Sequence, residues 1–302
     1  MGNNVNCWNA YIEEPSEKTI LSPAAAPVSK PSSISSSSVI TLKSIRDKIT
    51  IKDTSSLHSP ERLEKLSSPN LTTKELRLRV KNSQFFSKDF VLNISSQGYM
   101  SSKTKGVVYF GNKRKDCKGG EKICDFIIPC DGVKLYGQLF VIYYCVESDS
   151  YIIRDLGIGL GVYVKLEYSF KLTSDILINI GESHLYFRIV FTENSYPNLL
   201  LTVFSSGPIQ NYCFYAQEQH ISPIRIGRAR DCDICLDDML LSKYQASILY
   251  SHSQGWMLID GNLVRQRPST NGGWLYCSNN TCLDTGMEIK VAQNLFKVQV
   301  TS

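Results

Sequence analysis

Three short segments in the C-terminal third of the chain combine side chains that suit a phosphate group. They are Ile226-Gly227-Arg228, Leu241-Ser242-Lys243 and the stretch Ser269 to Trp274. Together they supply a guanidinium, several hydroxyls, an ammonium and a carboxamide. Charged donors form the strongest hydrogen bonds to phosphate oxygens, and a guanidinium presents its donors as a rigid fork. The three segments therefore predict a site for a phosphate and for the peptide that carries it.

Each of these segments borders a short run of β-branched and aromatic residues, and such runs recur from Phe90 onward. Parted by Gly, Asn and Ser, they are typical of an antiparallel β-sandwich. The expected strands include Val107 to Phe110, Leu139 to Tyr144, Tyr151 to Arg154, Val162 to Leu166, Ile176 to Ile180, Leu199 to Phe204, Ile224 to Ile226, Ala246 to Tyr250, Trp256 to Ile259 and Ile289 to Val291.

The two halves of this β-rich region parallel each other. Phe90 to Gly98 matches Leu199 to Gly207 in pattern, and Ile178 to Phe187 matches Ile289 to Phe296. Self-similarity at a fixed spacing indicates a structural repeat. The sequence therefore predicts an all-β fold with two tandem sandwiches, one over residues 86–194 and one over residues 195–302.

Residues 1–85 differ from the rest because they are rich in Ser and Pro, as in the run from Ser32 to Ser38. Such a composition buries too little apolar area to offset chain entropy, so a disordered arm is expected. Two apolar islands interrupt it: Val39 to Ile51, expected as a short strand or helix, and Leu71 to Val80, expected as one or two helical turns.

The order of the three polar segments, followed by Leu283 to Ile289, resembles the forkhead-associated (FHA) family throughout residues 195–302. Members of that family read phosphothreonine peptides. The resemblance implies that Arg228 and Ser242 hold the phosphate, with help from Lys243 and Thr270. Asn271 would bond the backbone of the peptide.

The resemblance also assigns residues that shape the loops. Gly227 and Gly272 would shape the loops that carry the binding residues. The family's Ser-x-x-His pattern ends here in Gln245, and a glutamine can still donate and accept hydrogen bonds. Gly273 stands where the family usually has Thr. Residues 262–268 are an insertion beside the site, in which Arg265 and Arg267 extend the positive charge.

The first sandwich lacks these groups at the matching places. Asn112 stands in place of the arginine, Tyr136 in place of the serine and Leu160 in place of the asparagine. We therefore expect a degenerate FHA-like copy that keeps the fold without the phosphate site. The glycines from Gly157 to Gly161 lack the Lys-Ser/Thr of a P-loop and do not indicate a nucleotide site.

Composition narrows the function further. A net charge of +5 over 302 residues is too diffuse to indicate nucleic-acid binding. No convincing nucleophile or carboxylate accompanies any of the four histidines, so neither an enzyme nor a cofactor is expected. The expected function is a phosphothreonine-peptide-binding adaptor with a phosphorylated protein as its partner. The alternative is an assembly protein that uses its sandwiches for phosphate-independent contacts.

The ten cysteines, in a chain with no export signal, indicate reduced thiols and a cytoplasmic location. Cys232 and Cys235 have zinc-knuckle spacing, and Cys277 and Cys282 offer a second half. However, Ile234 and Leu236 alternate around Cys235 as in a strand. The pattern favours core and loop cysteines over a metal site.

The first seven residues resemble a myristoylation signal at Gly2, with Cys7 placed for a second acyl chain. Two acyl chains would add a membrane surface to the partners. In the same arm, Thr50 precedes Asp53 by three residues, which makes the arm itself a candidate ligand of the second sandwich.

Overall fold

The computed structural model describes residues 74–99, 106–112, 124–130, 137–157, 161–191, 196–216 and 222–301. These residues form twenty β-strands and no helix, which confirms the expected all-β class. Accordingly, this part of the chain contains no helix that could cross a bilayer.

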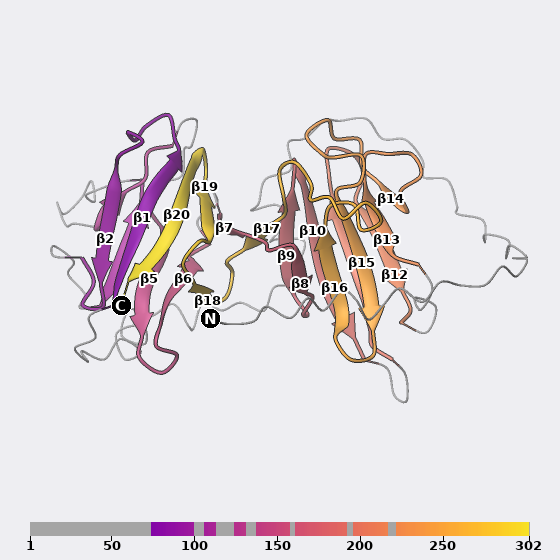
Figure 1. Ribbon diagram of the computed structural model, residues 1–302, viewed down its shortest axis with the longest axis horizontal. Coiled ribbons are helices and arrows are strands. Elements are labelled where there is room, and N and C mark those ends of the chain that lie inside the picture. Colours follow the sequence, from indigo (N-terminus) through magenta and orange to yellow (C-terminus); the bar gives the residue numbers. More distant parts are fainter. Residues whose placement is uncertain are drawn as a thin grey trace, which may run out of the picture. The chain divides into compact units, whose positions relative to one another are not determined.

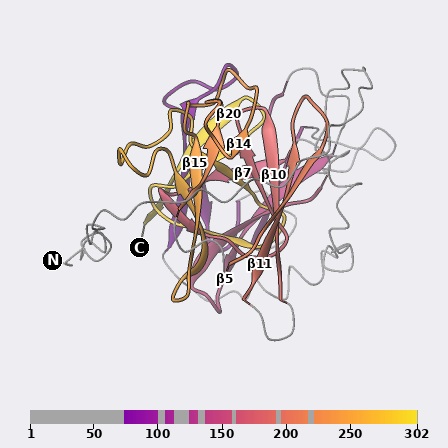
Figure 2. The same ribbon diagram turned by 90° about the vertical axis from the view of Figure 1, so that its right-hand side faces the viewer.

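The strands form one ten-stranded sheet and two five-stranded sheets around two separate hydrophobic cores. Each half of the ten-stranded sheet faces one five-stranded sheet. For the second core, Figure 2 shows β14 and β15 in one layer and β10 and β11 in the other. We call the two resulting units the first and the second sandwich.

The first sandwich contains the strands at the two ends of the described chain. They are β1 (Glu75–Asn82), β2 (Val91–Ser95), β3 (Val107–Gly111), β4 (Phe126–Ile127), β5 (Gln138–Cys145), β6 (Ser150–Asp155), β7 (Val162–Lys165), β18 (Thr281–Leu283), β19 (Glu288–Val291) and β20 (Asn294–Thr301).

The second sandwich contains the strands between them. They are β8 (Ser169–Lys171), β9 (Ile176–Ile180), β10 (Ser183–Val190), β11 (Asn198–Phe204), β12 (Gln210–Phe214), β13 (Ile224–Gly227), β14 (Ile234–Cys235), β15 (Ala246–Ser251), β16 (Gly255–Asp260) and β17 (Trp274–Tyr276).

The two sandwiches have the same strand order. In the first, the order is β2-β1-β20-β19-β7 in one sheet and β4-β3-β5-β6-β18 in the other. In the second, it is β12-β11-β10-β9-β17 and β14-β13-β15-β16-β8. Every strand of one sandwich thus has a counterpart in the other. The expected match of Phe90–Gly98 with Leu199–Gly207 is corrected, because β2 corresponds to β12, whereas β11 corresponds to β1. Strands β7 and β17 pair with each other and join the two halves of the ten-stranded sheet.

The last three strands of each sequence repeat lie in the sandwich of the other repeat. Strands β18, β19 and β20 pair with β6, β7 and β1, and β8, β9 and β10 pair with β16, β17 and β11. Figure 1 shows the yellow β20 beside the indigo β1. The expected division at residues 194 and 195 is therefore corrected, because each sandwich is completed by strands from both sides of that boundary.

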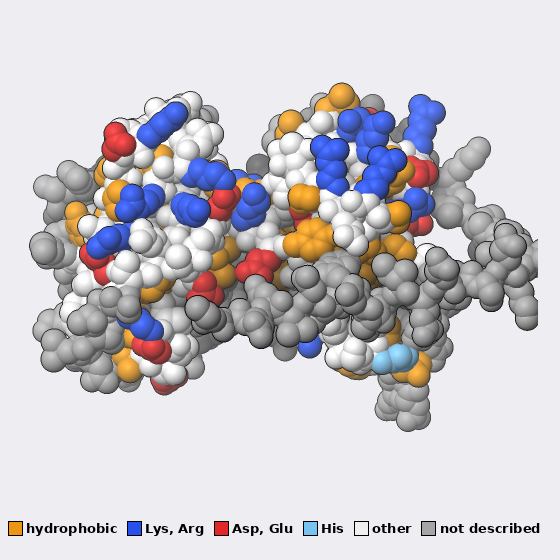
Figure 3. All heavy atoms as spheres, viewed as in Figure 1, with side chains coloured by type: hydrophobic (Ala, Val, Ile, Leu, Met, Phe, Trp, Pro, Cys, Tyr) orange, Lys and Arg blue, Asp and Glu red, His pale blue; other side chains and the backbone are white. Residues whose placement is uncertain are grey.

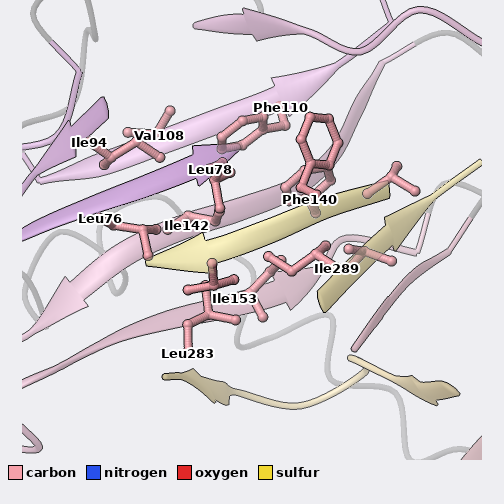
Figure 4. Close-up of a cluster of buried hydrophobic side chains, with 14 of the residues drawn as sticks. Leu76, Leu78, Ile94, Val108, Phe110, Phe140, Ile142, Ile153, Leu283 and Ile289 are labelled. Carbon is pink, nitrogen blue, oxygen red and sulfur yellow. The ribbon is translucent and has the colours of Figure 1, made fainter. Parts of the chain in front are cut away.

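The core of the first sandwich shows this exchange in its side chains. Leu76, Ile142 and Ile153 converge there with Leu283 and Ile289, which come from the far end of the chain (Figure 4). These five side chains are at most 1% exposed. Complete burial of such a side chain stabilises the fold by about 1.5–3 kcal/mol.

The structure also corrects the N-terminal boundary. Strand β1 begins at Glu75, inside the segment expected to be a disordered arm, and it covers most of the stretch expected as helical turns. Its inward residues Leu76, Leu78 and Val80 alternate with polar ones, and it pairs with both β2 and β20. This period of two fits a strand. The island from Val39 to Ile51 lies outside the described residues.

Candidate functional site

Strand β13 ends at Gly227, where two backbones approach too closely for any other residue. A Cβ at this position would lie 2.2 Å from the carbonyl oxygen of Lys243. The next residue, Arg228, donates its backbone N–H to the carbonyl of Ser242 at 3.3 Å. The first two expected segments therefore lie against each other.

The guanidinium of Arg228 is held at one point. Its Nε donates to the carbonyl oxygen of Leu241 at 2.8 Å, while the side chain remains exposed. Among the described residues, its two terminal nitrogens have no hydrogen-bond partner. The protein thus orients the guanidinium, and its two terminal nitrogens can still donate hydrogen bonds to an anion.

The third segment meets the second through two hydroxyl groups. The Ser242 hydroxyl lies 3.3 Å from the Thr270 hydroxyl, to which it donates, and it accepts the backbone N–H of Thr270 at 3.1 Å. Both side chains are accessible to solvent. Thr270 follows Ser242 by 28 positions, and the intervening residues form β15, β16 and the insertion, so the fold brings two distant segments together.

Gln245 joins these loops from below. Its side chain is fully buried. The Oε1 of Gln245 accepts the N–H of Ser242 at 3.0 Å. Its Nε2 donates to the Ser269 hydroxyl at 2.8 Å and to the Gly272 carbonyl at 3.2 Å. The carboxamide thus provides the loop bracing that the family pattern gives to a histidine. Gly272 itself is buried, with a φ of +70°.

Asn271 is exposed at the rim, and its Nδ2 donates to the carbonyl of Leu240 at 2.8 Å. A tight hairpin at Asn271-Gly272 would pair β16 with β17. Instead β17 pairs with β7 and β9, and β16 pairs with β15 and β8. The asparagine therefore belongs to a loop between two sheets, where its carboxamide ties two neighbouring loops together.

Positive charge gathers at this end of the second sandwich, as the Lys and Arg side chains in Figure 3 show. Lys243, Arg265 and Arg267 are exposed there. Arg225 is engaged by Asp231 at 3.1 Å, and a hydrogen bond from Tyr244 is the main cause that lowers the pKa of that carboxyl. Arg228 and Lys243 have no such acidic partner among the described residues.

Sequence reasoning missed two carboxylates that support the loops. Asp260 accepts both the hydroxyl and the N–H of Ser269, at 2.6 and 3.1 Å. Asp238 accepts the N–H of Leu240 at 2.8 Å within its own loop. Asp260 is half-buried at the end of β16, and Asp238 is buried in the loop that follows β14. The spacing of neither residue in the sequence points to these hydrogen-bond partners.

At the matching place in the first sandwich, the side chain of Asn112 is hydrogen-bonded to the backbone. Its Oδ1 accepts the N–H of Gly137 at 3.0 Å, next to the turn that closes β3. A carboxamide used in this way offers no cation to a phosphate. Tyr136 and Leu160 lie outside the described residues.

The two cysteine pairs belong to different sandwiches. In the second, Cys235 is on β14 and Cys232 precedes that strand, whereas Cys277 is in the core of the first and Cys282 is on β18. Burial raises the pKa of Cys277 to about 12 and also raises the pKa of Cys232. No group of three or more metal-ligating side chains occurs in the described ranges.

Of the remaining expected residues, Gly2, Cys7 and Thr50 fall outside the described part of the chain, as do two of the four histidines, His58 and His220. His184 is on β10 near Tyr163, and His252 contacts the rings of Tyr196 and Tyr250. Neither histidine contacts the loops described above.

Comparison with known proteins gives one match. Neither a search of curated proteins nor a search of solved structures found a similar protein. Residues 224–291 match the family model of the FHA domain, and this range holds every side chain of the phosphate-suited loops. FHA domains are phosphothreonine-binding interaction modules without enzymatic activity of their own. The chain therefore contains an FHA domain, and its segment from Ile224 to Val291 belongs to that family.

Proposed function

We propose that the second sandwich is a phosphothreonine-peptide reader and that the protein acts as an adaptor through it. Arg228, Ser242, Lys243 and Thr270 bind the phosphate, and Asn271 bonds the peptide backbone. The observation that carries the proposal is that the Ser242 and Thr270 hydroxyls lie 3.3 Å apart, while the Arg228 guanidinium is held through its Nε by the carbonyl of Leu241, the residue before Ser242.

The energetics support a binding event that depends on phosphorylation. A charge-assisted hydrogen bond contributes about 1.5–3 kcal/mol, and a phosphate supplies close to two negative charges and three acceptor oxygens. Two or three such bonds are enough to make the affinity for a phosphorylated peptide measurable when the unphosphorylated peptide does not bind. A threonine methyl adds only about 0.8 kcal/mol, so the site gains most of its selectivity from the phosphate.

The bracing by Gln245 favours this reader over the assembly protein. The absence of the family's histidine was the feature that kept the alternative open. With Ser242, Ser269 and Gly272 all bonded to the carboxamide of Gln245, the loops have their support without it. Phosphate-independent partner binding is the outcome that would revive the alternative.

The test uses the full chain and a phosphothreonine peptide array, followed by fluorescence anisotropy on the best peptide. Arg228→Ala should weaken binding by about 10- to 150-fold, equivalent to one charge-assisted contact. Arg230→Ala is the matched control, because it removes the same charge from an exposed position two residues away. Equal affinity for the unphosphorylated peptide, or equal loss in both variants, would refute the proposal.

A further inference from the structure

The loop that orients Arg228 and Asn271 is itself held by the turn between β9 and β10. Residues 238–241 carry both carbonyls involved: that of Leu241 accepts from Arg228, and that of Leu240 accepts from Asn271. The position of this loop therefore decides where the guanidinium and the carboxamide are presented.

Asp238 fixes that loop from two sides. It is only 8% exposed, its Oδ1 accepts the N–H of Leu240 at 2.8 Å, and its Oδ2 accepts the N–H of Glu182 at 2.7 Å. The first bond closes the loop on itself. The second ties it to the turn between β9 and β10, which belongs to the first sequence repeat.

The turn at Gly181 leaves no room for a side chain. Gly181 has a φ of +53°, and a Cβ there would lie 2.3 Å from Oδ2 of Asp238 and 2.9 Å from Cδ2 of Leu241. Leu241 is buried against this point. Only glycine combines this backbone conformation with so close an approach.

The turn is anchored in its own right. Asn179 donates from Nδ2 to the carbonyls of Gly181 and Ser183, at 3.1 and 3.0 Å. Its Oδ1 accepts from the ammonium of Lys290 at 2.8 Å. The support for the turn therefore comes from β9 and β19, and β9 also pairs directly with β17, which follows the Ser269–Gly273 loop.

We propose that the turn Gly181–Glu182 positions the phosphopeptide site through Asp238. The inference rests on the proposed function, which it deepens. It also gives the first repeat a part in phosphopeptide binding. Although the first repeat has Asn112 in place of the phosphate-binding arginine, it contributes the turn that sets the geometry of the site in the second sandwich.

The experiment compares two neighbouring aspartates in the full-length protein. Asp238→Ala removes both hydrogen bonds, whereas Asp237→Ala removes the same charge from an exposed position. We expect Asp238→Ala to weaken binding of the phosphothreonine peptide by about tenfold, the equivalent of one lost contact, and Asp237→Ala by less than about twofold. Asp238→Asn keeps one acceptor oxygen and should restore part of the affinity.

A second pair of variants tests the turn. Gly181→Ala should weaken binding about as much as Asp238→Ala, because the new methyl displaces the carboxylate. Glu182→Ala leaves the backbone N–H in place and should bind like the wild type. Hydrogen exchange of the amides of residues 239–243 provides a readout that needs no peptide: it should speed up in Asp238→Ala and Gly181→Ala and stay unchanged in the two controls.

These readouts separate the two proposals. A wild-type protein that does not prefer the phosphorylated peptide overturns the reader and, with it, the role of the turn. A wild type that binds, with unchanged affinity in Asp238→Ala and Gly181→Ala, overturns the positioning role alone. Unchanged hydrogen exchange in those variants shows that Asp238 does not hold the loop.

Discussion

The carboxamide of Gln245 connects groups from two loops in a place that water does not reach. Replacement by alanine would remove its three hydrogen bonds, including that of the Ser242 N–H, and leave a void beneath the site. Because buried groups without partners are costly, we expect Gln245→Ala to lower the free energy of unfolding by about 2–4 kcal/mol. Guanidinium denaturation, followed by tryptophan fluorescence, measures this loss.

Gln245→His is the informative companion variant, since histidine is the residue of the family pattern. An imidazole offers one donor and one acceptor, so it can keep part of the bonding and should cost less than alanine. A loss in Gln245→Ala below about 0.5 kcal/mol would contradict the bracing role, because surface substitutions have effects of that size.

Some residues at the site could be predicted from the sequence, and others could not. Arg228, Ser242, Thr270 and Asn271 were predicted because donors at strand ends follow a recognisable order, and the fold brings their loops together. Asp238 was not predicted. Its partner Glu182 lies 56 residues away, and nothing in the spacing of either residue reveals the other.

At the scale of elements, the half-buried Lys290 on β19 reaches across β7 and β17 to Asn179 on β9. Among the described residues, the ammonium of Lys290 has no acidic partner. It donates to Asn179 and lies 4.6 Å from the ring centre of Trp274 and 5.1 Å from that of Tyr163. Burial lowers the pKa of Lys290 to about 8. The aromatic faces offset part of the cost of burying the charge.

His184 on β10 responds to the same environment. Burial, and to a lesser extent the charge of Lys290, lowers the pKa of His184 from 6.5 to about 4. The folded state therefore favours the neutral ring. Its contribution to stability is complete above about pH 6.5 and is lost as the pH falls through about 4.

We expect Lys290→Met to raise the pKa of His184 while leaving it below 6.5, because the ring stays buried when the nearby charge is gone. A titration of the His184 ring protons by NMR in both proteins measures the two values. Unfolding experiments on His184→Gln should show a shallower loss of stability between pH 6.5 and 4 than the wild type. A wild-type His184 that titrates at its ordinary value would contradict this account.

At the scale of the whole molecule, the exchange of strands could not have been predicted from the pattern of the sequence. Strands β10 and β20 both direct every second residue into a sandwich core, and they occupy equivalent places in equivalent sheets. Alternation predicts that each strand joins a sandwich, and it also predicts which face is buried. It does not distinguish between two sandwiches of the same design, so the tandem arrangement was the natural expectation.

Paired cysteines distinguish the exchanged arrangement from the sequential one. Arg79 on β1 lies opposite Lys297 on β20, and both are exposed. Directly opposite residues have Cβ atoms about 4.5–5.5 Å apart, within reach of a disulfide after modest adjustment. Arg79→Cys combined with Lys297→Cys should form an intramolecular disulfide in the monomer, identified as a linked peptide pair by mass spectrometry.

The control pair keeps the cysteine at position 297 on β20 and places the second cysteine on β11. Strand β11 is the partner that β20 would have if each repeat formed its own sandwich. Thr202 on β11 pairs with Tyr186 of β10, the counterpart of Lys297 in the equivalent sheet. Thr202→Cys combined with Lys297→Cys should therefore stay reduced under the same conditions. If this second pair forms the bond and the first does not, each repeat keeps its own last three strands. The turn at Gly181 would then lie in the first sandwich, and Asp238 would have to find another partner for its second oxygen.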